Sequence, residues 1–347
     1  MTGIPINVVM CAPLLGNDLS PVRALEPAVN VIDATAVFSA YGRVLASGDA
    51  AQAEAARAPL DELLAQADVV CMSFPMLKDV AASSPKLRWL HHTNAGVSNL
   101  YSTDVWAKEN ILLTSGRGHV RPTAMAEYSI AGAMLFARGI HDGYLDKPNA
   151  KLDRSHYKPI RLEGSTLGVV GLGGIGKETA RLAKALGMRV LGTRRSVTEP
   201  QHDVDNADVV LPADELKQMV AECDFVAVCC QLTDETFHLM NREVFAAMKP
   251  TAVVTNISRG EVIDEEALIE ALNQGRIRGA VLDVYEGEMA GKPPRPELWA
   301  SPNVVLTPHI SATGGADTEM MSLFVENLRR YVAGEDLLNV VDRARGY

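Results

Sequence analysis

The feature of this sequence that most constrains its fold is an alternation of short segments rich in Val, Ile and Leu with longer segments rich in Ala, Leu and Glu. This alternation is typical of parallel sheets covered by helices, because strands buried on both faces are apolar throughout. The length of 347 residues suits two domains of roughly 150 residues each, or one large α/β unit. A helix-then-strand cadence shared by residues 61–70 and 214–226 favours two similar α/β domains.

The alternation falls into two series, separated at residues 141–163 by a polar stretch with two prolines that we interpret as a surface connection. The first series predicts strands at 6–10, 28–32, 68–73, 87–91 and 110–114, and most clearly a helix at 59–66. The second predicts strands at 167–170, 189–192, 208–211, 225–229, 252–256, 280–284 and 304–306. Its helices are expected at about 174–186, 213–222, 241–248, 264–274 and 317–333. A long helix at about 123–140 is apolar on nearly every face, so we expect it to be buried between domains or between subunits.

A glycine-rich loop follows the predicted strand at 167–170 and opens a helix. In this GxGxxG pattern Gly171 permits the tight turn, Gly173 lets the backbone approach a pyrophosphate, and Gly176 allows close helix–strand packing. The helix N-terminus then offers N–H groups and a partial positive charge to the phosphates. A structural turn in another doubly wound domain is the alternative. The pattern predicts a dinucleotide site formed by Gly171, Leu172, Gly173, Gly174, Ile175 and Gly176.

The end of the second strand of this domain bears on the choice of cofactor. An acid normally binds the ribose hydroxyls of NAD there, but this sequence has Arg194 at that position, 23 residues after Gly171. Two guanidinium groups and two hydroxyls suit a 2′-phosphate, whereas a solvated basic turn is the alternative. We therefore expect NADP (NADPH) to be preferred over NAD, bound through Thr193, Arg194, Arg195 and Ser196.

Three further stretches place polar and charged residues beyond strand ends, at 256–265 (NISRGEVIDE), 283–288 (DVYEGE) and 303–310 (NVVLTPHI). Their order downstream of the glycine loop resembles the D-isomer-specific 2-hydroxyacid dehydrogenase family, and the similarity covers nearly the whole chain. The resemblance implies a Rossmann cofactor domain at 120–309, inserted in a flavodoxin-like substrate domain at 1–119 and 310–347. It also implies a homodimer formed through the Rossmann domain.

The resemblance further implies three catalytic residues: Arg259, Glu288 and His309. Their chemistry suits 2-keto acid reduction, which needs a proton donor at the carbonyl oxygen and a cation for the carboxylate. Histidine titrates near neutrality, a carboxylate on its other ring nitrogen fixes the tautomer, and the arginine fork grips a carboxylate. Glu286 is the alternative to Glu288, which we prefer because it falls five residues after Asp283, as in the family pattern.

The same resemblance assigns other contacts. The backbone N–H groups of Ala95 and Gly96 would bind the substrate carboxylate, and Met76 would form a pocket wall. Asp283 would meet the nicotinamide carboxamide. The remaining residues expected to line the cofactor cleft are Cys230, Gln231 and Ile257. Gln231 and Gly174 depart from the proline and arginine common in the family, which puts adenine-side affinity in doubt.

Composition excludes several other functions. Acidic residues outnumber basic ones 43 to 33, so we expect no nucleic-acid partner. No segment approaches the roughly 20 apolar residues of a membrane span. The five cysteines are odd in number and without CxxC spacing, so we interpret them as buried small hydrophobes and expect no metal and a cytoplasmic location.

These observations lead to one functional hypothesis, an NADPH-dependent oxidoreductase that converts a glyoxylate- or hydroxypyruvate-type 2-keto acid to a D-2-hydroxy acid. Formate and phosphite oxidation are disfavoured, because relatives with those activities carry glutamine in place of Glu288 and lysine in place of Ala95. Two alternatives stay open: an NAD-preferring D-2-hydroxyacid dehydrogenase, and a dinucleotide-sensing corepressor of the same fold.

Overall fold

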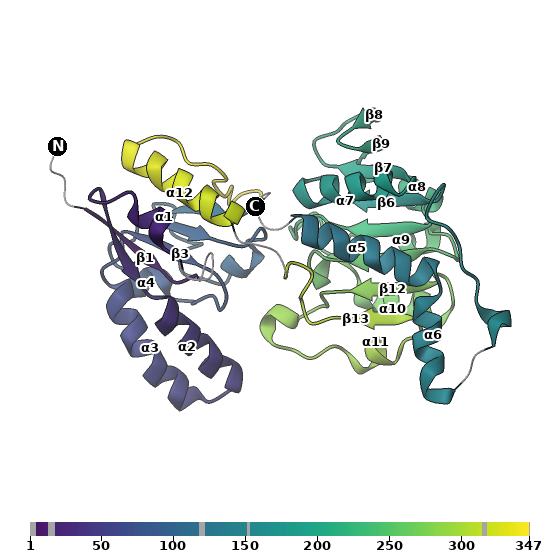
Figure 1. The fold of residues 1–347 in the computed structure, drawn as a ribbon, viewed down its shortest axis with the longest axis horizontal. Coiled ribbons are helices and arrows are strands. Elements are labelled where there is room, and N and C mark those ends of the chain that lie inside the picture. Colours follow the sequence, from purple (N-terminus) through teal and green to yellow (C-terminus); the bar gives the residue numbers. More distant parts are fainter. Residues whose placement is uncertain (1–4, 13–17, 118–121, 151–152, 314–317, 347) are drawn as a thin grey trace. The chain divides into compact units, whose positions relative to one another are not determined.

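The computed structural model describes residues 5–12, 18–117, 122–150, 153–313 and 318–346 (Figure 1). The chain divides into unit 1, Met1–Val120 with Ala316–Tyr347, and unit 2, Arg121–Gly315. The resemblance implies that the second part of the substrate domain starts at residue 310, whereas the described residues 310–313 cluster with unit 2. The reason is local, since the backbone N–H groups of Ile310 and Ser311 donate to the side chain of Asp283 in unit 2.

The described part of unit 1 holds a five-stranded parallel sheet in the order β2-β1-β3-β4-β5. This order is that of flavodoxin-like folds, which confirms the prediction for this part of the chain. The strands lie within a few residues of the predicted segments: β1 (Ile6–Met10), β2 (Val29–Asp33), β3 (Val69–Met72), β4 (Trp89–His92) and β5 (Leu112–Ser115).

Helices cover both faces of the unit 1 sheet (Figure 1). Its described helices are α1 (Ser20–Arg23), α2 (Thr35–Ser47), α3 (Ala50–Leu64), α4 (Val80–Ser83) and α12 (Thr318–Ala333). On one face Phe38 of α2 and Leu60 of α3 share a core with Leu90. On the other face Phe324 of α12 packs against Trp89, with ring centroids 5.6 Å apart. Helix α12, near the end of the sequence, therefore covers one face of the sheet formed by residues of the first third of the chain.

Helix α3 shows where the sequence pattern misleads. The sequence pattern predicts a helix only at 59–66. In the structure Pro59 lies inside a helix that begins at Ala50, after Asp49 caps the N–H of Gln52. The Ala-rich first half has too little apolar periodicity to be recognised as a helix.

The described part of unit 2 holds an eight-stranded sheet in the order β13-β12-β11-β10-β6-β7-β9-β8. All neighbours are parallel except β8 and β9. Strand order reverses between β6 and β10, and ligands of such sheets bind beyond the carboxyl ends of the strands at that point. The strands are β6 (Thr166–Val170), β7 (Arg189–Arg194), β8 (Gln201–Val204), β9 (Ala207–Pro212), β10 (Phe225–Val228), β11 (Val253–Asn256), β12 (Gly279–Leu282) and β13 (Val304–Leu306).

Two cores flank this sheet. Helices α5 and α7 contribute Phe136 and Ala180 to one core, and α8, α9 and α10 contribute Val220, Phe245 and Leu272 to the other. The helices described in unit 2 are α5 (Pro122–Ala137), α6 (Ile140–Asp146), α7 (Gly174–Ala185), α8 (Leu216–Glu222), α9 (Arg242–Ala247), α10 (Glu265–Asn273) and α11 (Pro296–Ala300). The predicted fold class of two α/β parallel-sheet domains is confirmed.

The sequence pattern misses strand β8, which pairs antiparallel with β9 at the edge of the sheet (Figure 1). Three of its four residues are polar and exposed, so the strand lacks the apolar run that marks a parallel strand. The turn between the strands is Asp205-Asn206, with φ of 53° and 65°. Two successive positive φ values are typical of a tight hairpin turn, where Asp and Asn are favoured.

The long helix α5 buries one face on the unit 2 sheet, where a Cβ added to Gly132 would lie 3.1 Å from Oγ1 of Thr255. Its other face is not covered in a single chain, because Met134 is 37% exposed. Neighbouring α6 leaves three more apolar side chains exposed: Ile140, Tyr144 and Leu145.

All five cysteines are free thiols. Burial raises the pKa of Cys11, Cys223, Cys229 and Cys230 to about 12. These thiols therefore stay protonated near neutrality. The expected burial holds for Cys11, Cys71 and Cys223, whereas Cys229 and Cys230 are only partly buried. Within the described segments, no helix is both long and apolar enough to cross a membrane.

Candidate active site

The site begins with a histidine and a carboxylate held together in unit 2. Nδ1 of His309, in the loop after β13, lies 2.9 Å from Oε1 of Glu288. Glu288 opens a short 3₁₀ turn directly after Gly287, whose φ is 85°. The carboxylate is nearly buried whereas the imidazole is half exposed. Since the carboxylate lies on the Nδ1 side of the ring, Nε2 is the nitrogen left to exchange a proton with a ligand.

Asp283 holds the loop that carries His309. Its buried carboxylate accepts from the Thr307 hydroxyl at 2.6 Å and from the N–H groups of Ile310 and Ser311 at 2.7 and 2.8 Å. Its backbone carbonyl accepts from the N–H of His309 at 2.9 Å. Four bonds thus fix this loop to the end of β12. The nicotinamide contact that the resemblance implies for Asp283 stays a prediction.

A tyrosine from α5 extends this network. The Tyr128 hydroxyl lies 2.5 Å from Oγ1 of Thr307. Since Thr307 donates its own proton to Asp283, Tyr128 is the donor in this pair. Burial raises the pKa of Tyr128, so the phenol keeps its proton.

Arg259 follows β11 in a turn that Asn256 closes. The buried amide of Asn256 accepts from the N–H and hydroxyl of Ser258 at 3.0 and 2.9 Å, and donates to the carbonyl of Arg259 at 2.9 Å. The half-buried guanidinium donates to the carbonyl of Ser258 at 2.7 Å. This turn fixes the backbone from which the arginine fork projects.

The Arg259 and Glu288 segments pack backbone against backbone. A Cβ added to Gly260 would lie 2.0 Å from the carbonyl carbon of Tyr285, so only glycine allows this approach. Two more contacts hold the second segment, because Glu265 accepts from the N–H of Glu286 at 3.1 Å and Glu261 from the N–H of Gly287 at 3.3 Å.

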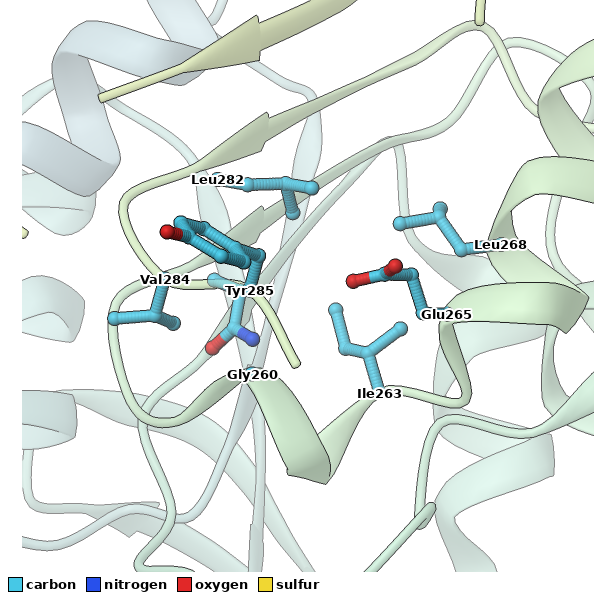
Figure 2. A pocket seen from close by; sticks show the side chains of 8 residues that line it. Gly260, Ile263, Glu265, Leu268, Leu282, Val284 and Tyr285 are labelled. Atoms are coloured by element: carbon cyan, nitrogen blue, oxygen red, sulfur yellow. The ribbon is translucent and has the colours of Figure 1, made fainter. Parts of the chain in front are cut away.

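A small pocket lies beside this packing, lined by Asn256, Gly260, Ile263, Glu265, Leu268, Leu282, Val284 and Tyr285. Figure 2 shows the Glu265 carboxylate pointing between apolar side chains, with Ile263 and Leu268 beside it. Burial raises the pKa of Glu265. Its bond to the N–H of Glu286 ties α10 to the segment that carries Glu288.

The glycine loop has the shape that a pyrophosphate needs. Gly171 has a φ of 90°, and a Cβ there would lie 2.7 Å from Cα of Cys230. A Cβ on Gly176 would lie 2.4 Å from the carbonyl oxygen of Gly171. A Cβ on Gly173 would meet no heavy atom within 4 Å. The loop is therefore tightly packed at Gly171 and Gly176 and open at Gly173, next to the first turn of α7. These residues fit a dinucleotide.

The four residues expected at the 2′-phosphate differ in placement. Arg194 is half-buried, donates to the carbonyl of Leu172 at 3.0 and 3.1 Å, and forms an ion pair with Asp205. Arg195 pairs with Glu235 at 2.9 Å. Thr193 is only 4% exposed and its hydroxyl accepts from the N–H of Gly171 at 3.4 Å, so this side chain supports the loop from below. Ser196 is exposed.

The other residues expected at the cofactor follow β10 and β11. Cys230 faces Gly171 through its backbone. The carbonyl of Gln231 accepts from the Thr236 hydroxyl at 2.6 Å. Ile257 is buried and its N–H donates to the carbonyl of Val228 at 3.4 Å. These three residues follow the carboxyl ends of β10 and β11. Strand β10 is the neighbour of β6 at the point where the strand order reverses.

The residues expected to bind substrate in unit 1 lie at the carboxyl ends of two neighbouring strands. Met76 is half-buried in the segment after β3. Ala95 and Gly96 are half-buried in the loop after β4. The N–H of Gly116 donates to the carbonyl of Asn94 at 3.0 Å and so closes this loop.

A family model described as "D-isomer specific 2-hydroxyacid dehydrogenase, NAD binding domain" matches residues 130–311, more than half of the chain. The chain belongs to this family. The matched region lies within unit 2 and contains Arg259, Glu288 and His309. Both the resemblance and a nicotinamide dinucleotide as cofactor are therefore confirmed.

Individual relatives agree with this family membership. The chain is 44% identical to a glyoxylate reductase of Thermococcus onnurineus over 52% of each protein. It is 34% identical to a glyoxylate reductase of Pyrococcus horikoshii over 79% of this chain and 82% of that protein. The chain spans about half the length of the first two curated relatives it matches. The crystal structure of a D-isomer-specific 2-hydroxyacid dehydrogenase from Xanthobacter autotrophicus, solved with NADPH and MES, superimposes with a TM-score of 0.75 at 27% identity and covers 99% of this chain and 100% of that one.

Several residues that shape the site escape a motif search. Asn256 and Thr307 stand inside the quoted motifs but no role was expected of them. Asn256 is the last residue of β11, and Thr307 directly follows β13. Tyr128 lies far away in the chain on an apolar helix, and only the fold brings it to Thr307. Asp205 sits in a hairpin whose second strand alone is predicted.

Proposed function

We propose that the protein reduces small 2-keto acids of the glyoxylate or hydroxypyruvate type to D-2-hydroxy acids, with NADPH as the preferred reductant. The observation that carries the proposal is the contact of His309 with a nearly buried Glu288, in a unit that also holds Arg259 and a glycine loop open at Gly173. Support for the substrate class comes from relatives named glyoxylate reductase. The D configuration rests on the family.

Each residue has one task in this reaction. The bound nicotinamide supplies the hydride. His309 donates the proton from Nε2 to the carbonyl oxygen, and Glu288 keeps the other ring proton on Nδ1. Arg259 binds the carboxylate and polarises the carbonyl with its fork. Residues 171–176 would hold the pyrophosphate, and the contact of Ala95 and Gly96 with the substrate carboxylate stays a prediction.

The preference for NADPH rests on the end of β7. A carboxylate there would repel a 2′-phosphate, whereas Arg194 offers a cation at this position. The relative from Xanthobacter autotrophicus was solved with NADPH. We expect kcat/KM with NADPH to exceed that with NADH by roughly 30- to 1,000-fold, which corresponds to about 2–4 kcal/mol.

A substrate panel tests the proposal. Glyoxylate, hydroxypyruvate, pyruvate and phenylpyruvate are each assayed with NADPH and with NADH at one ionic strength, followed by the absorbance of the reduced nicotinamide. Chiral chromatography of the hydroxypyruvate product should show the D-hydroxy acid. No turnover with any of the four acids would overturn the proposed activity, and equal or faster reaction with NADH would overturn the cofactor preference.

We also propose that the protein is a homodimer through unit 2. The support is the apolar surface of Met134, Ile140, Tyr144 and Leu145, which are 37, 56, 75 and 55% exposed in the single chain. Surfaces of this kind mark interfaces. Light scattering coupled to gel filtration should give twice the chain mass, and Tyr144→Glu with Leu145→Glu should shift it to the monomer. A monomeric wild type overturns the assignment.

A further inference from the structure

The hairpin turn between β8 and β9 brings a carboxylate to the end of β7. Asp205, the first residue of that turn, forms an ion pair with Nη2 of Arg194. The same guanidinium donates through Nε and Nη2 to the carbonyl of Leu172 in the glycine loop. The hairpin turn, the end of β7 and the glycine loop are thus joined through one arginine.

A second cation meets the same carboxylate. Nζ of Lys177, in the first turn of α7, lies 3.0 Å from Oδ1 of Asp205. The hydrogen bond from Arg194, aided by Lys177, lowers the pKa of Asp205, so it is ionised near neutrality. The side chains of Asp205 and Arg194 are 26 and 23% exposed, so they remain in reach of a dissolved ligand.

We propose that Asp205 is a specificity-determining residue that competes with the 2′-phosphate of NADPH for Arg194 and Lys177. The inference rests on the proposed preference for NADPH and adds the residue that limits it. Asp205 pairs with Nη2 of Arg194, and the carbonyl of Leu172 accepts from Nε and Nη2. A phosphate that binds Nη2 must therefore displace the carboxylate. A dinucleotide without the 2′-phosphate leaves the ion pair intact.

The position of Asp205 explains why it would affect the choice between NADPH and NADH. Family members that prefer NAD carry their acid at the end of the second strand, where this chain has Arg194. The hairpin returns an acid to the same neighbourhood from eleven residues further along. Arg194 and Asp205 therefore oppose each other, and the proposed NADPH preference is what remains of the arginine's effect.

Two half-cofactors test the competition without any substrate. Adenosine 2′,5′-bisphosphate carries the 2′-phosphate and 5′-AMP lacks it, and calorimetry gives the affinity of the whole protein for each. The variant is Asp205→Asn, because asparagine tolerates the positive φ of this turn; Asp205→Gly serves if the first variant folds poorly. Asp203→Asn is the matched control, since Asp203 is exposed in the same hairpin and carries the same charge.

The proposal predicts that Asp205→Asn binds the bisphosphate about fivefold or more tightly than wild type, with 5′-AMP affinity changed by less than about twofold. Asp203→Asn should stay within about twofold for both compounds, and Arg194→Gln combined with Asp205→Asn should abolish the gain. Unchanged or weaker bisphosphate binding by Asp205→Asn overturns the proposal, because Asp205 would then be neutral or would position Arg194 for the phosphate. Absence of keto-acid turnover would overturn the proposed function alone, since the titrations read the nucleotide site directly.

Discussion

His309 and Glu288 approach to 2.9 Å between Nδ1 and Oε1, yet their side chains are 37% and 8% exposed. The carboxylate is therefore shielded from solvent to a much greater extent than the imidazole. This difference agrees with the roles proposed for the two residues, in which the carboxylate would orient the ring and the ring would carry the proton.

Replacement of the proton donor gives the first prediction. His309→Asn should lower kcat by roughly 10²–10⁴-fold, the usual contribution of a general acid. Asparagine is chosen because His309 has a φ of 53°, which asparagine tolerates. NADPH binding, measured by nicotinamide fluorescence, should persist. His202→Asn on exposed β8 is the control, and a kcat within about threefold of wild type for His309→Asn would remove the assignment.

The choice between two neighbouring glutamates gives the second prediction. Glu288→Gln keeps the shape of the side chain but loses the charge and lets the amide face Nδ1 in the wrong orientation, so kcat should fall about 10- to 100-fold. Glu286 lies 3.6 Å from His238 and is 39% exposed. Glu286→Gln should therefore stay within about twofold of wild type. The reverse ranking in steady-state assays would transfer the role to Glu286.

Arg259 gives the third prediction, because a residue that binds the substrate carboxylate affects KM as well as kcat. Arg259→Ala should raise the KM for the keto acid by about tenfold or more and lower kcat together with it. Arg242→Ala removes an exposed arginine paired with Glu270 and is the control. If the keto-acid KM is unchanged in Arg259→Ala, Arg259 has a structural role only.

The sheets of both units could be predicted because parallel strands buried on both faces form short apolar runs. Strand β8 could not, since it has exposed polar residues and takes its place only from pairing with β9. The first half of α3 has the same difficulty, because alanine favours a helix without marking a buried face. The spacing of apolar residues indicates which face of an element is buried, and both β8 and the first half of α3 bury few side chains.

The chemistry of the site was visible in the motifs, but its support was not. His309 and Glu288 are 21 residues apart. The resemblance implies a carboxylate beside the histidine, but it does not indicate what holds the two residues together. The contact depends on Gly260, where the Arg259 and Tyr285 segments touch, and on Asp283, whose carboxylate fixes the loop of His309. Such support depends on tertiary packing, which a single sequence does not specify residue by residue.

Gly260 gives the fourth prediction. A Cβ there would lie 2.0 Å from the carbonyl carbon of Tyr285, which is backbone and cannot rotate away. Gly260→Ala should lower the free energy of unfolding by about 1–3 kcal/mol and should also lower kcat, because the Glu288 segment must move. Gly143→Ala is the control, since its Cβ would make an ordinary contact of 3.5 Å with the Tyr157 hydroxyl. Equal stability of the two variants in urea titrations would contradict the packing described here.

The fifth prediction concerns acid stability and starts from a histidine outside the catalytic machinery. His91 is fully buried on β4, with Nδ1 2.8 Å from Oγ1 of Thr114 and its ring 5.2 Å from that of Phe324. Burial, together with the neighbouring His92, lowers the pKa of His91 from 6.5 to about 3. Between these two values the unfolded chain binds a proton at this position that the folded protein does not.

The sign of the pH dependence follows from that difference. Because the unfolded state binds more protons between about pH 3 and 6.5, stability rises with pH across this window, is fully present above it, and is lost as the pH falls. At 1.36 kcal/mol per pH unit, the step from pH 7 to pH 5 should cost wild type about 2 kcal/mol through His91.

His91→Gln, or His91→Phe if the first variant is too unstable, cannot take up this proton. Urea unfolding at both pH values should therefore show a loss about 2 kcal/mol smaller in the variant than in wild type, whereas His202→Gln on exposed β8 should behave as wild type. An equal loss in wild type and in the His91 variants would mean that His91 can take up a proton in the folded protein.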